Sequence, residues 1–351
     1  MPVLTMAQAL NTALRDALTA DGTVTMAKAL NTALRDALRA DENTLVFGED
    51  VGTLGGVFRV TDGLAREFGD DRCFDTPLAE SAIIGTAVGM AMYGYRPVVE
   101  MQFDAFAYPA FEQLVSHVAK FRARTRGALP LPLTVRIPYG GGIGGVEHHS
   151  DSSEIYYMAT PGLTVVTPAT VADAYSLLRR SIDWPDPVVF LEPKRLYWHK
   201  EKTGLPTDTG PLGWAAVRRR GTDATLVTYG PALPAALAAA EAAAESGLSL
   251  EVIDLRTLAP FDEETVAASV DRTGRAVVVH EAHGFAGPGA EIAARITERC
   301  FYRLEAPVRR VTGFDVPYPA PLLESHYLPD VQRILDAVAT LEWPARRTAA
   351  A

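Results

Sequence analysis

The stretches PVVEMQF (Pro97–Phe103), LPLTVRI (Leu131–Ile137) and PVVFLEP (Pro187–Pro193) decide the fold class of this chain. Each is a short, nearly continuous apolar run, and amphipathic helical patterns at Pro109–Arg124 and Val171–Ile182 separate them. Continuous apolar strands alternating with helices are typical of a parallel sheet covered on both faces. We therefore expect an α/β fold built on a parallel sheet.

A second alternating run follows a segment rich in Pro, Gly, Thr and Lys. It includes the apolar stretches LEVIDLR (Leu250–Arg256) and RAVVVHE (Arg275–Glu281). Such a composition break between two periodic regions is typical of a linker. We expect a first α/β domain over residues 25–200, a linker over residues 201–213 and a smaller α/β domain over residues 214–345.

The N-terminus contains a local duplication. Thr5–Asp21 recurs almost unchanged as Thr25–Asp41, with a period of 20 residues. Nothing later repeats it, and a solenoid needs about three units, so a repeat architecture is rejected. We expect the second copy to be the native helix and residues 1–24 to form a peripheral, duplicated helix.

The composition excludes several classes of protein. The chain has 351 residues and a formal net charge of −10, which disfavours binding to nucleic acid. No apolar run reaches the roughly 18–20 residues that a membrane helix needs. The only cysteines, Cys73 and Cys300, lie far apart, so neither a disulfide framework nor a Cys-rich metal site is expected. These features favour a cytoplasmic protein.

Two segments carry residues suited to acid–base chemistry. Glu49 lies in GEDVG (Gly48–Gly52) directly after an apolar run, where open α/β sheets bind ligands. The alternative is a pair of loop carboxylates that cap the next helix. The glycine-rich segment 140–150 contains His148 and His149, and imidazole side chains in general suit acid–base roles; the alternative is a flexible surface loop with solvated histidines.

Other chemistries find little support in the sequence. His280 and His283 have an HxxH spacing, but no third ligand accompanies them, so a loop or interface role is favoured over a metal site. The chain has no GxSxG elbow, and Cys73 has no histidine partner nearby in sequence, which disfavours nucleophilic catalysis.

Taken together, six motifs resemble one known family, the β subunit of the thiamine-diphosphate-dependent 2-oxoacid dehydrogenase decarboxylase component. The resemblance runs from about Thr25 to the C-terminal helix, and it implies a transketolase-like pyrimidine-binding domain with a parallel sheet, followed by a smaller α/β transketolase C-terminal domain. The EPKRLY ending, the EMQF strand and LEAPVRRVTGFDVPYP are most similar to the branched-chain 2-oxoacid enzymes. The motifs are LVFGEDVG (Leu45–Gly52), FDTPLAES (Phe74–Ser81), EMQF (Glu100–Phe103), HHSDSSE (His148–Glu154), DPVVFLEPKRLY (Asp186–Tyr197) and VIDLRTLAPFD (Val252–Asp262).

The resemblance also implies roles for individual residues. Glu49 matches the glutamate that hydrogen-bonds the cofactor's pyrimidine ring; when protonated, such a glutamate favours the imino tautomer that removes the thiazolium proton. Phe106 matches the aromatic partner of that ring. His149 is implied to assist proton transfer or reductive acylation of lipoamide. Leu78, Glu80 and Gln102 lie on matching stretches that line the cofactor pocket.

The resemblance further implies an assembly of two α and two β chains with a lipoyl-bearing acyltransferase core. This chain contains no GDG motif, so the magnesium site for the cofactor's diphosphate is expected on the α subunit, and the chain alone should be inactive. The family's monovalent cation site is in doubt, because Trp184 replaces an aspartate in the turn Ser181–Asp186.

The expected function is decarboxylation of a branched-chain 2-oxoacid with reductive acylation of the lipoyl group. One alternative is the β subunit of a pyruvate or acetoin dehydrogenase. Another is a non-catalytic docking scaffold.

Overall fold

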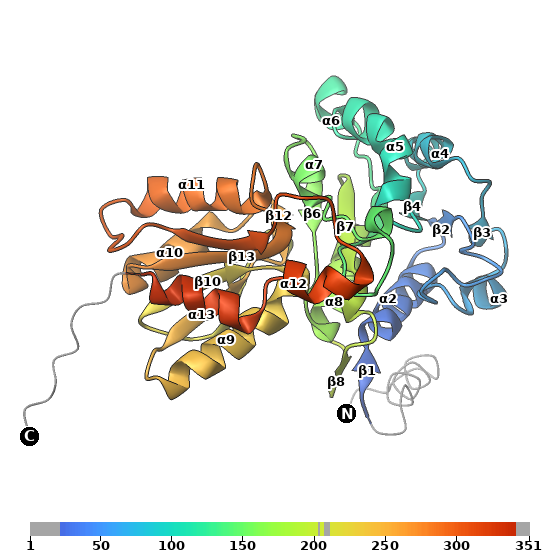
Figure 1. The fold of residues 1–351 in the computed structure, drawn as a ribbon. Helices are drawn as coiled ribbons and strands as arrows, with labels where there is room; N and C mark the ends of the chain where they lie inside the picture. Colours follow the sequence, from blue (N-terminus) through green and yellow to red (C-terminus); the bar gives the residue numbers. More distant parts are fainter. Residues whose placement is uncertain (1–21, 203, 207–210, 342–351) are drawn as a thin grey trace, which may run out of the picture. The chain divides into compact units, whose positions relative to one another are not determined.

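The computed structural model describes residues 22–202, 204–206 and 211–341; the first copy of the duplicated helix lies outside them. The described chain divides into two compact units, the first ending at Leu212 and the second beginning at Gly213, with the short segment Gly144–Glu147 grouped with the second. Figure 1 shows both as layers of helices on a central sheet. No helix among the described residues is long and apolar enough to cross a membrane.

The first unit is built on a parallel sheet, as the sequence predicts. Its strands follow the order β6-β7-β5-β4-β2-β3, and every neighbouring pair is parallel. Five of the six strands are buried along their whole length or all but one residue, which explains why they are nearly continuous apolar runs. The strands are β2 (Thr44–Gly48), β3 (Cys73–Asp75), β4 (Arg96–Glu100), β5 (Thr134–Tyr139), β6 (Thr164–Val166) and β7 (Val188–Pro193).

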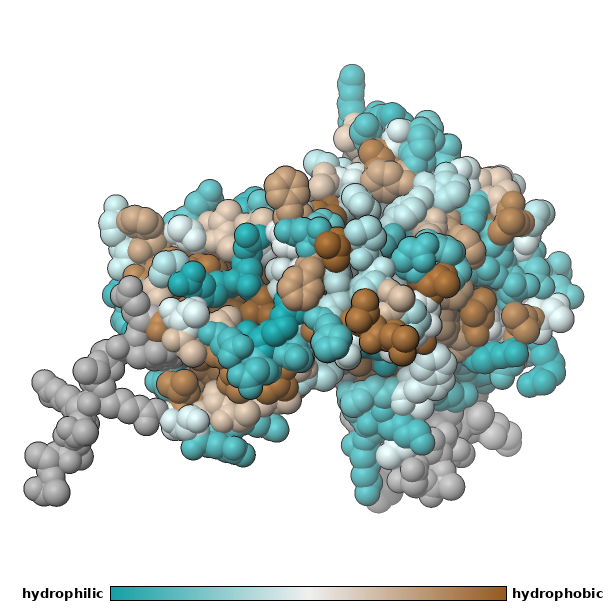
Figure 2. Space-filling view, in the orientation of Figure 1, coloured by the Kyte–Doolittle hydropathy of each residue, from teal (hydrophilic) through white to brown (hydrophobic). Residues whose placement is uncertain are grey.

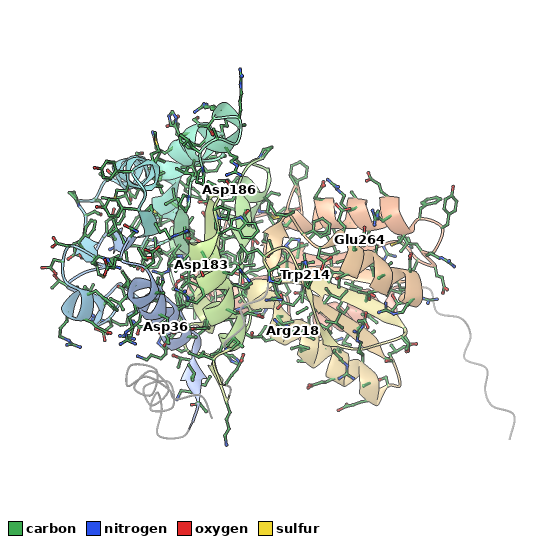
Figure 3. The ribbon with its side chains drawn as sticks, turned by 180° about the vertical axis from the view of Figure 1, so that it is seen from behind. Asp36, Asp183, Asp186, Trp214, Arg218 and Glu264 are labelled. Carbon is green, nitrogen blue, oxygen red and sulfur yellow. The ribbon has the colours of Figure 1, made fainter. Side chains whose placement is uncertain are left out.

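Helices α2 (Met26–Ala40) and α8 (Val171–Asp183) pack together on this sheet. α2 is the second copy of the duplicated sequence: the Thr25 hydroxyl caps it by accepting from the Lys28 backbone N–H at 3.2 Å, and its Ala/Leu face belongs to the core. The Tyr175 hydroxyl of α8 donates at 2.8 Å to Asp36 of α2, which is labelled in Figure 3.

The predicted helix at 109–124 is not continuous. It is split into α5 (Tyr108–Gln113), a π-helical turn at Leu114–Val118 and α6 (Phe121–Arg124). A π turn inserts one residue per turn, which the apolar spacing alone does not reveal. Strand β1 (Val24–Thr25) pairs antiparallel with β8 (Lys200–Glu201). This unit also contains the helices α3 (Leu64–Phe68), α4 (Glu80–Met92) and α7 (Glu154–Met158).

The second unit has its own sheet, ordered β14-β13-β10-β11-β9, in which only β9 runs antiparallel. α10 and α11 cover one face and α9 and α13 the other (Figure 1). Its elements are β9 (Ala216–Arg219), β10 (Ala224–Thr228), α9 (Leu233–Glu245), β11 (Leu250–Asp254), β12 (Thr257–Ala259), α10 (Glu263–Thr273), β13 (Ala276–His283), α11 (Pro288–Cys300), β14 (Arg309–Gly313), α12 (Glu324–Tyr327) and α13 (Val331–Ala339).

A buried charged network crosses the centre of the first sheet. The Arg136 guanidinium on β5 donates to Glu100 of β4 at 2.6 Å and to both carboxylate oxygens of Glu192 of β7, at 2.7 and 3.0 Å. The Tyr197 hydroxyl donates to Glu192 at 2.6 Å. All four residues are buried, so each charge depends on its partners to offset the cost of desolvation.

Candidate functional site

The site begins where β2 meets β4. Gly48 ends β2 and pairs in register with Glu100, and a Cβ at Gly48 would lie 2.4 Å from the Glu100 backbone oxygen. Only glycine permits this approach, because any side chain would overlap the neighbouring strand. The chain turns immediately afterwards, which places Glu49 at the carboxyl end of a parallel strand, where open α/β sheets bind ligands.

Glu49 is a largely buried carboxyl group. The residue is 7% exposed, and its Oε1 is buried without a hydrogen-bond partner. Burial, together with the nearby charges of Glu80 and Asp50, raises the pKa of Glu49 to about 7, against a hydrogen bond with the Ala79 backbone that favours the charged form. Near neutral pH this carboxyl therefore retains a proton in a large fraction of molecules, which suits it to acid–base chemistry.

The other predicted pocket residues have different surroundings. Glu80 is the first residue of α4, is largely buried and acts on Glu49 electrostatically. Gln102 donates from Nε2 to the Asp50 carboxylate at 2.7 Å, so it contacts the residue beside Glu49. Leu78 is 76% exposed. The structure thus brings Glu80 and Gln102 to the Glu49 turn and leaves the side chain of Leu78 in solvent.

His149 lies in an aromatic cluster with the predicted Phe106. The Phe106 ring meets the imidazole nearly perpendicular, with centroids 5.1 Å apart and an interplanar angle of 83°. Phe103 stacks on the same imidazole at 4.1 Å and 21°. Phe103 has no signal of its own in the sequence beyond its place at the end of the EMQF motif, three residues before Phe106.

A buried ion pair lies beside this cluster. The Lys194 ammonium is 3.3 Å from the Asp104 carboxylate, and both side chains are fully buried. Burial raises the pKa of Asp104 to about 7, and the charge of Lys194 opposes this rise. The Lys194 ammonium also lies over the Phe103 ring, 5.7 Å from its centroid. Apolar strand patterns gave no signal for this pair, since its members are 90 residues apart.

The sequence favours a loop or interface role for His280 and His283, but the structure places both in strand β13 (Ala276–His283). His280 lies within β13, fully buried, and its Nε2 accepts a hydrogen bond from the Gly289 backbone N–H of α11 at 2.9 Å. Burial and the charge of Arg310 lower its pKa to about 3, so the imidazole is neutral. Over the described ranges, no three His, Cys, Asp or Glu side chains are grouped to hold a metal ion.

The turn Ser181–Asp186, where Trp184 replaces the aspartate of a monovalent cation site, contacts other parts of the protein through its own side chains. The Ser181 hydroxyl donates to the Leu177 carbonyl at 2.7 Å, and Arg122 forms an ion pair with Asp186 at 3.4 Å. Figure 3 shows Asp183 and Asp186 on the segment that ends α8.

Comparison with known proteins shows the family. The pyrimidine-binding domain of transketolase matches residues 22–199, and the transketolase C-terminal domain matches residues 213–334. The β subunit of 3-methyl-2-oxobutanoate dehydrogenase from Mycobacterium tuberculosis is 59% identical over 95% of this chain and 91% of that protein. The β subunit of the pyruvate dehydrogenase E1 component from Leifsonia xyli is 52% identical over 95% and 94%.

Among solved structures, a split-gene transketolase described as an inactive β4 tetramer matches with a TM-score of 0.75. It covers 91% of this chain and 98% of its own, and at 22% identity it supports the fold alone. The two domain matches and the level of identity to full-length β subunits agree with the architecture described above. This chain belongs to the family of β subunits of the decarboxylase (E1) component of 2-oxoacid dehydrogenases.

Proposed function

We propose that this chain is the β subunit of a branched-chain 2-oxoacid dehydrogenase. With an α subunit it would decarboxylate acids such as 3-methyl-2-oxobutanoate and transfer the acyl group to a lipoyl group of an acyltransferase core. The observation that carries the proposal is Glu49, a buried carboxyl with an unpartnered Oε1 at the carboxyl end of β2. The 59% identity to a 3-methyl-2-oxobutanoate dehydrogenase β subunit supports the substrate class.

The residues around Glu49 fit thiamine diphosphate, on which this family of enzymes depends. When bound, the cofactor supplies a nucleophilic carbon for the 2-oxo group and accepts the electron pair left by carbon dioxide. Glu49 would donate its proton in a hydrogen bond to the pyrimidine ring, since its raised pKa keeps it protonated near neutrality. Phe106 would provide the aromatic contact, with Leu78, Glu80 and Gln102 lining the pocket.

His149 would hold or transfer a proton during decarboxylation or acyl transfer. An imidazole is suited to this because its ordinary pKa lies close to neutrality. Its place in the aromatic cluster with Phe106 supports the assignment, because Phe106 is itself a proposed cofactor contact. His148 is the less suitable candidate, since the rings of Phe103 and Phe106 lie against His149.

The remaining half of the cofactor site would belong to the α subunit. The chain has no GDG motif for the diphosphate's magnesium ion, so we propose that the metal is held by α, in an assembly of two α and two β chains. Large apolar side chains at the surface agree with burial by a partner: Leu78 is 76% exposed and Tyr93 85% exposed. Figure 2 shows hydrophobic patches on the visible face.

Reconstitution tests this proposal. The chain would be mixed with its α subunit, magnesium and thiamine diphosphate, and decarboxylation of 3-methyl-2-oxobutanoate and of pyruvate would be measured beside each subunit alone. We expect activity only in the mixture and a higher kcat/KM for the branched acid. Activity of this chain without α would contradict the shared site.

Pyruvate is the second candidate substrate, because β subunits of pyruvate dehydrogenase are also 52% and 48% identical to this chain. A higher kcat/KM for pyruvate in the same assay would select this candidate and leave the role of Glu49 intact. Full activity of the Glu49→Gln variant in the complex would instead indicate a scaffold that contributes no catalytic group.

A further inference from the structure

The loop that carries His149 is rich in glycine. Gly140, Gly142 and Gly144 all have positive φ, and His149 ends a three-residue 3-10 turn at Glu147–His149. Such a short turn has few backbone hydrogen bonds with which to fix a side chain. The side chains that contact the imidazole therefore contribute to its orientation.

Three rings contact the imidazole. The His148 ring is tilted against it, with centroids 4.3 Å apart and an interplanar angle of 54°. The two phenylalanine rings act differently from each other. Phe103 covers the face of the imidazole, with a centroid distance of 4.1 Å and nearly parallel planes, whereas Phe106 meets it edge-on. A parallel contact at this distance fixes the plane of the imidazole, because a tilt brings the two rings into overlap.

Phe103 is itself held firmly to the sheet. It follows β4 by three residues, and the next residue, Asp104, forms the fully buried ion pair with Lys194, which directly follows β7. The Phe58 ring packs against Phe103 at 5.4 Å. Contacts from two strand ends and a third segment thus fix the ring on which His149 stacks.

We propose that Phe103 is a positioning residue for His149: it transfers the rigidity of the sheet to an imidazole carried by a glycine-rich loop. The inference rests on the proposed role of His149 in proton transfer. Without Phe103 the imidazole would sample other orientations, and a displacement of about 1 Å at a reacting group can lower the rate about 10²-fold.

The test uses four variants of the full chain. Phe103→Leu removes the aromatic face, Phe103→Tyr retains it, and His149→Ala removes the imidazole. Phe111→Leu is the matched control, because Phe111 also makes ring contacts, with Tyr156 and Tyr157, but none with His149. Turnover is measured in the complex reconstituted with α, and the His149 ring resonances are measured by NMR in the chain alone, assigned by their loss in His149→Ala.

We expect Phe103→Leu to lower kcat at least tenfold with less than a twofold change in KM. In the His149→Ala background the same change should have no further effect, because Phe103 acts through His149. In the chain alone, the upfield ring-current shift of the His149 protons should disappear in Phe103→Leu. In both Phe103→Tyr and Phe111→Leu, kcat should stay within twofold of the wild-type value. The chemical shifts of the His149 protons should stay within one linewidth of their wild-type values.

Three results would overturn the inference. Normal kcat in Phe103→Leu beside an impaired His149→Ala would refute positioning while preserving the role of His149. An equal loss of kcat in both backgrounds would indicate a general structural effect of Phe103. Unchanged His149 resonances in Phe103→Leu would show that the ring does not hold the imidazole. Full turnover of His149→Ala would instead refute the proposed function of His149 itself.

Discussion

Replacing Glu49 by Gln should make the protein more stable at alkaline pH while impairing its proposed catalysis. A pKa of about 7 in place of 4.5 destabilises the folded state, once the carboxyl is ionised, by about 3 kcal/mol at 1.36 kcal/mol per pH unit. Partial solvent screening reduces this to about 2 kcal/mol. Because the folded pKa is raised, the folded form binds the proton more tightly, and stability is lost as pH rises from 4.5 through 7.

Thermal unfolding of the isolated chain, followed by circular dichroism at pH 5 and pH 8, measures the effect. At about 2–4 °C per kcal/mol for a domain of this size, Glu49→Gln should unfold about 4–8 °C above the wild type at pH 8, with a clearly smaller difference at pH 5. Glu42→Gln is the matched control, because Glu42 is exposed and the same charge is removed. A Glu49→Gln variant that is less stable than wild type at pH 8, or equally shifted at both pH values, would show that the ionised Glu49 carboxylate does not destabilise the folded protein.

Three further predictions concern the framework of the site. Arg136→Met leaves Glu100 and Glu192 buried without their cation and should lower the free energy of unfolding by about 3–5 kcal/mol in urea titrations; a loss below about 1 kcal/mol would contradict the account of the network. His280→Gln removes a buried imidazole whose pKa of about 3 keeps it neutral in the folded protein. The free energy of unfolding of the wild type should therefore fall by about 2 kcal/mol between pH 7 and pH 5, and the difference in stability between wild type and His280→Gln should narrow over that range in thermal unfolding. A difference in stability that does not change with pH would exclude this linkage. Gly48→Ala should unfold earlier than wild type in the same thermal assay, because its Cβ would meet the Glu100 backbone oxygen, and an unchanged midpoint would show that β4 yields easily.

Local patterns predicted the parallel sheet and the position of Glu49. An apolar run followed by GED marks a strand end, and the strand end is where ligands bind, so the residue could be named before its surroundings were known. The raised pKa of Glu49 could not be predicted in this way. It depends on burial and on Glu80, which lies 31 residues away in the sequence.

Local sequence patterns also could not predict the buried charged network or the aromatic cluster around His149. Glu100, Arg136 and Glu192 each interrupt an apolar strand, and their partners are 36 and 56 residues apart in the sequence. Phe103 and Lys194 read as ordinary residues at the ends of strands until the fold brings them together. Periodicity reveals which face of an element is buried, whereas pairing between elements requires the tertiary structure.

Hydrogen–deuterium exchange at the cofactor's thiazolium carbon measures whether Glu49 activates thiamine diphosphate in a site shared with α. The exchange rate would be measured by quenched-flow NMR in the reconstituted complex, with wild-type chain and with Glu49→Gln at matched cofactor occupancy. General acid–base assistance of this kind is worth about 10²–10⁴-fold, so exchange in Glu49→Gln should be at least about 10²-fold slower. Equal exchange rates in the two complexes would contradict the account.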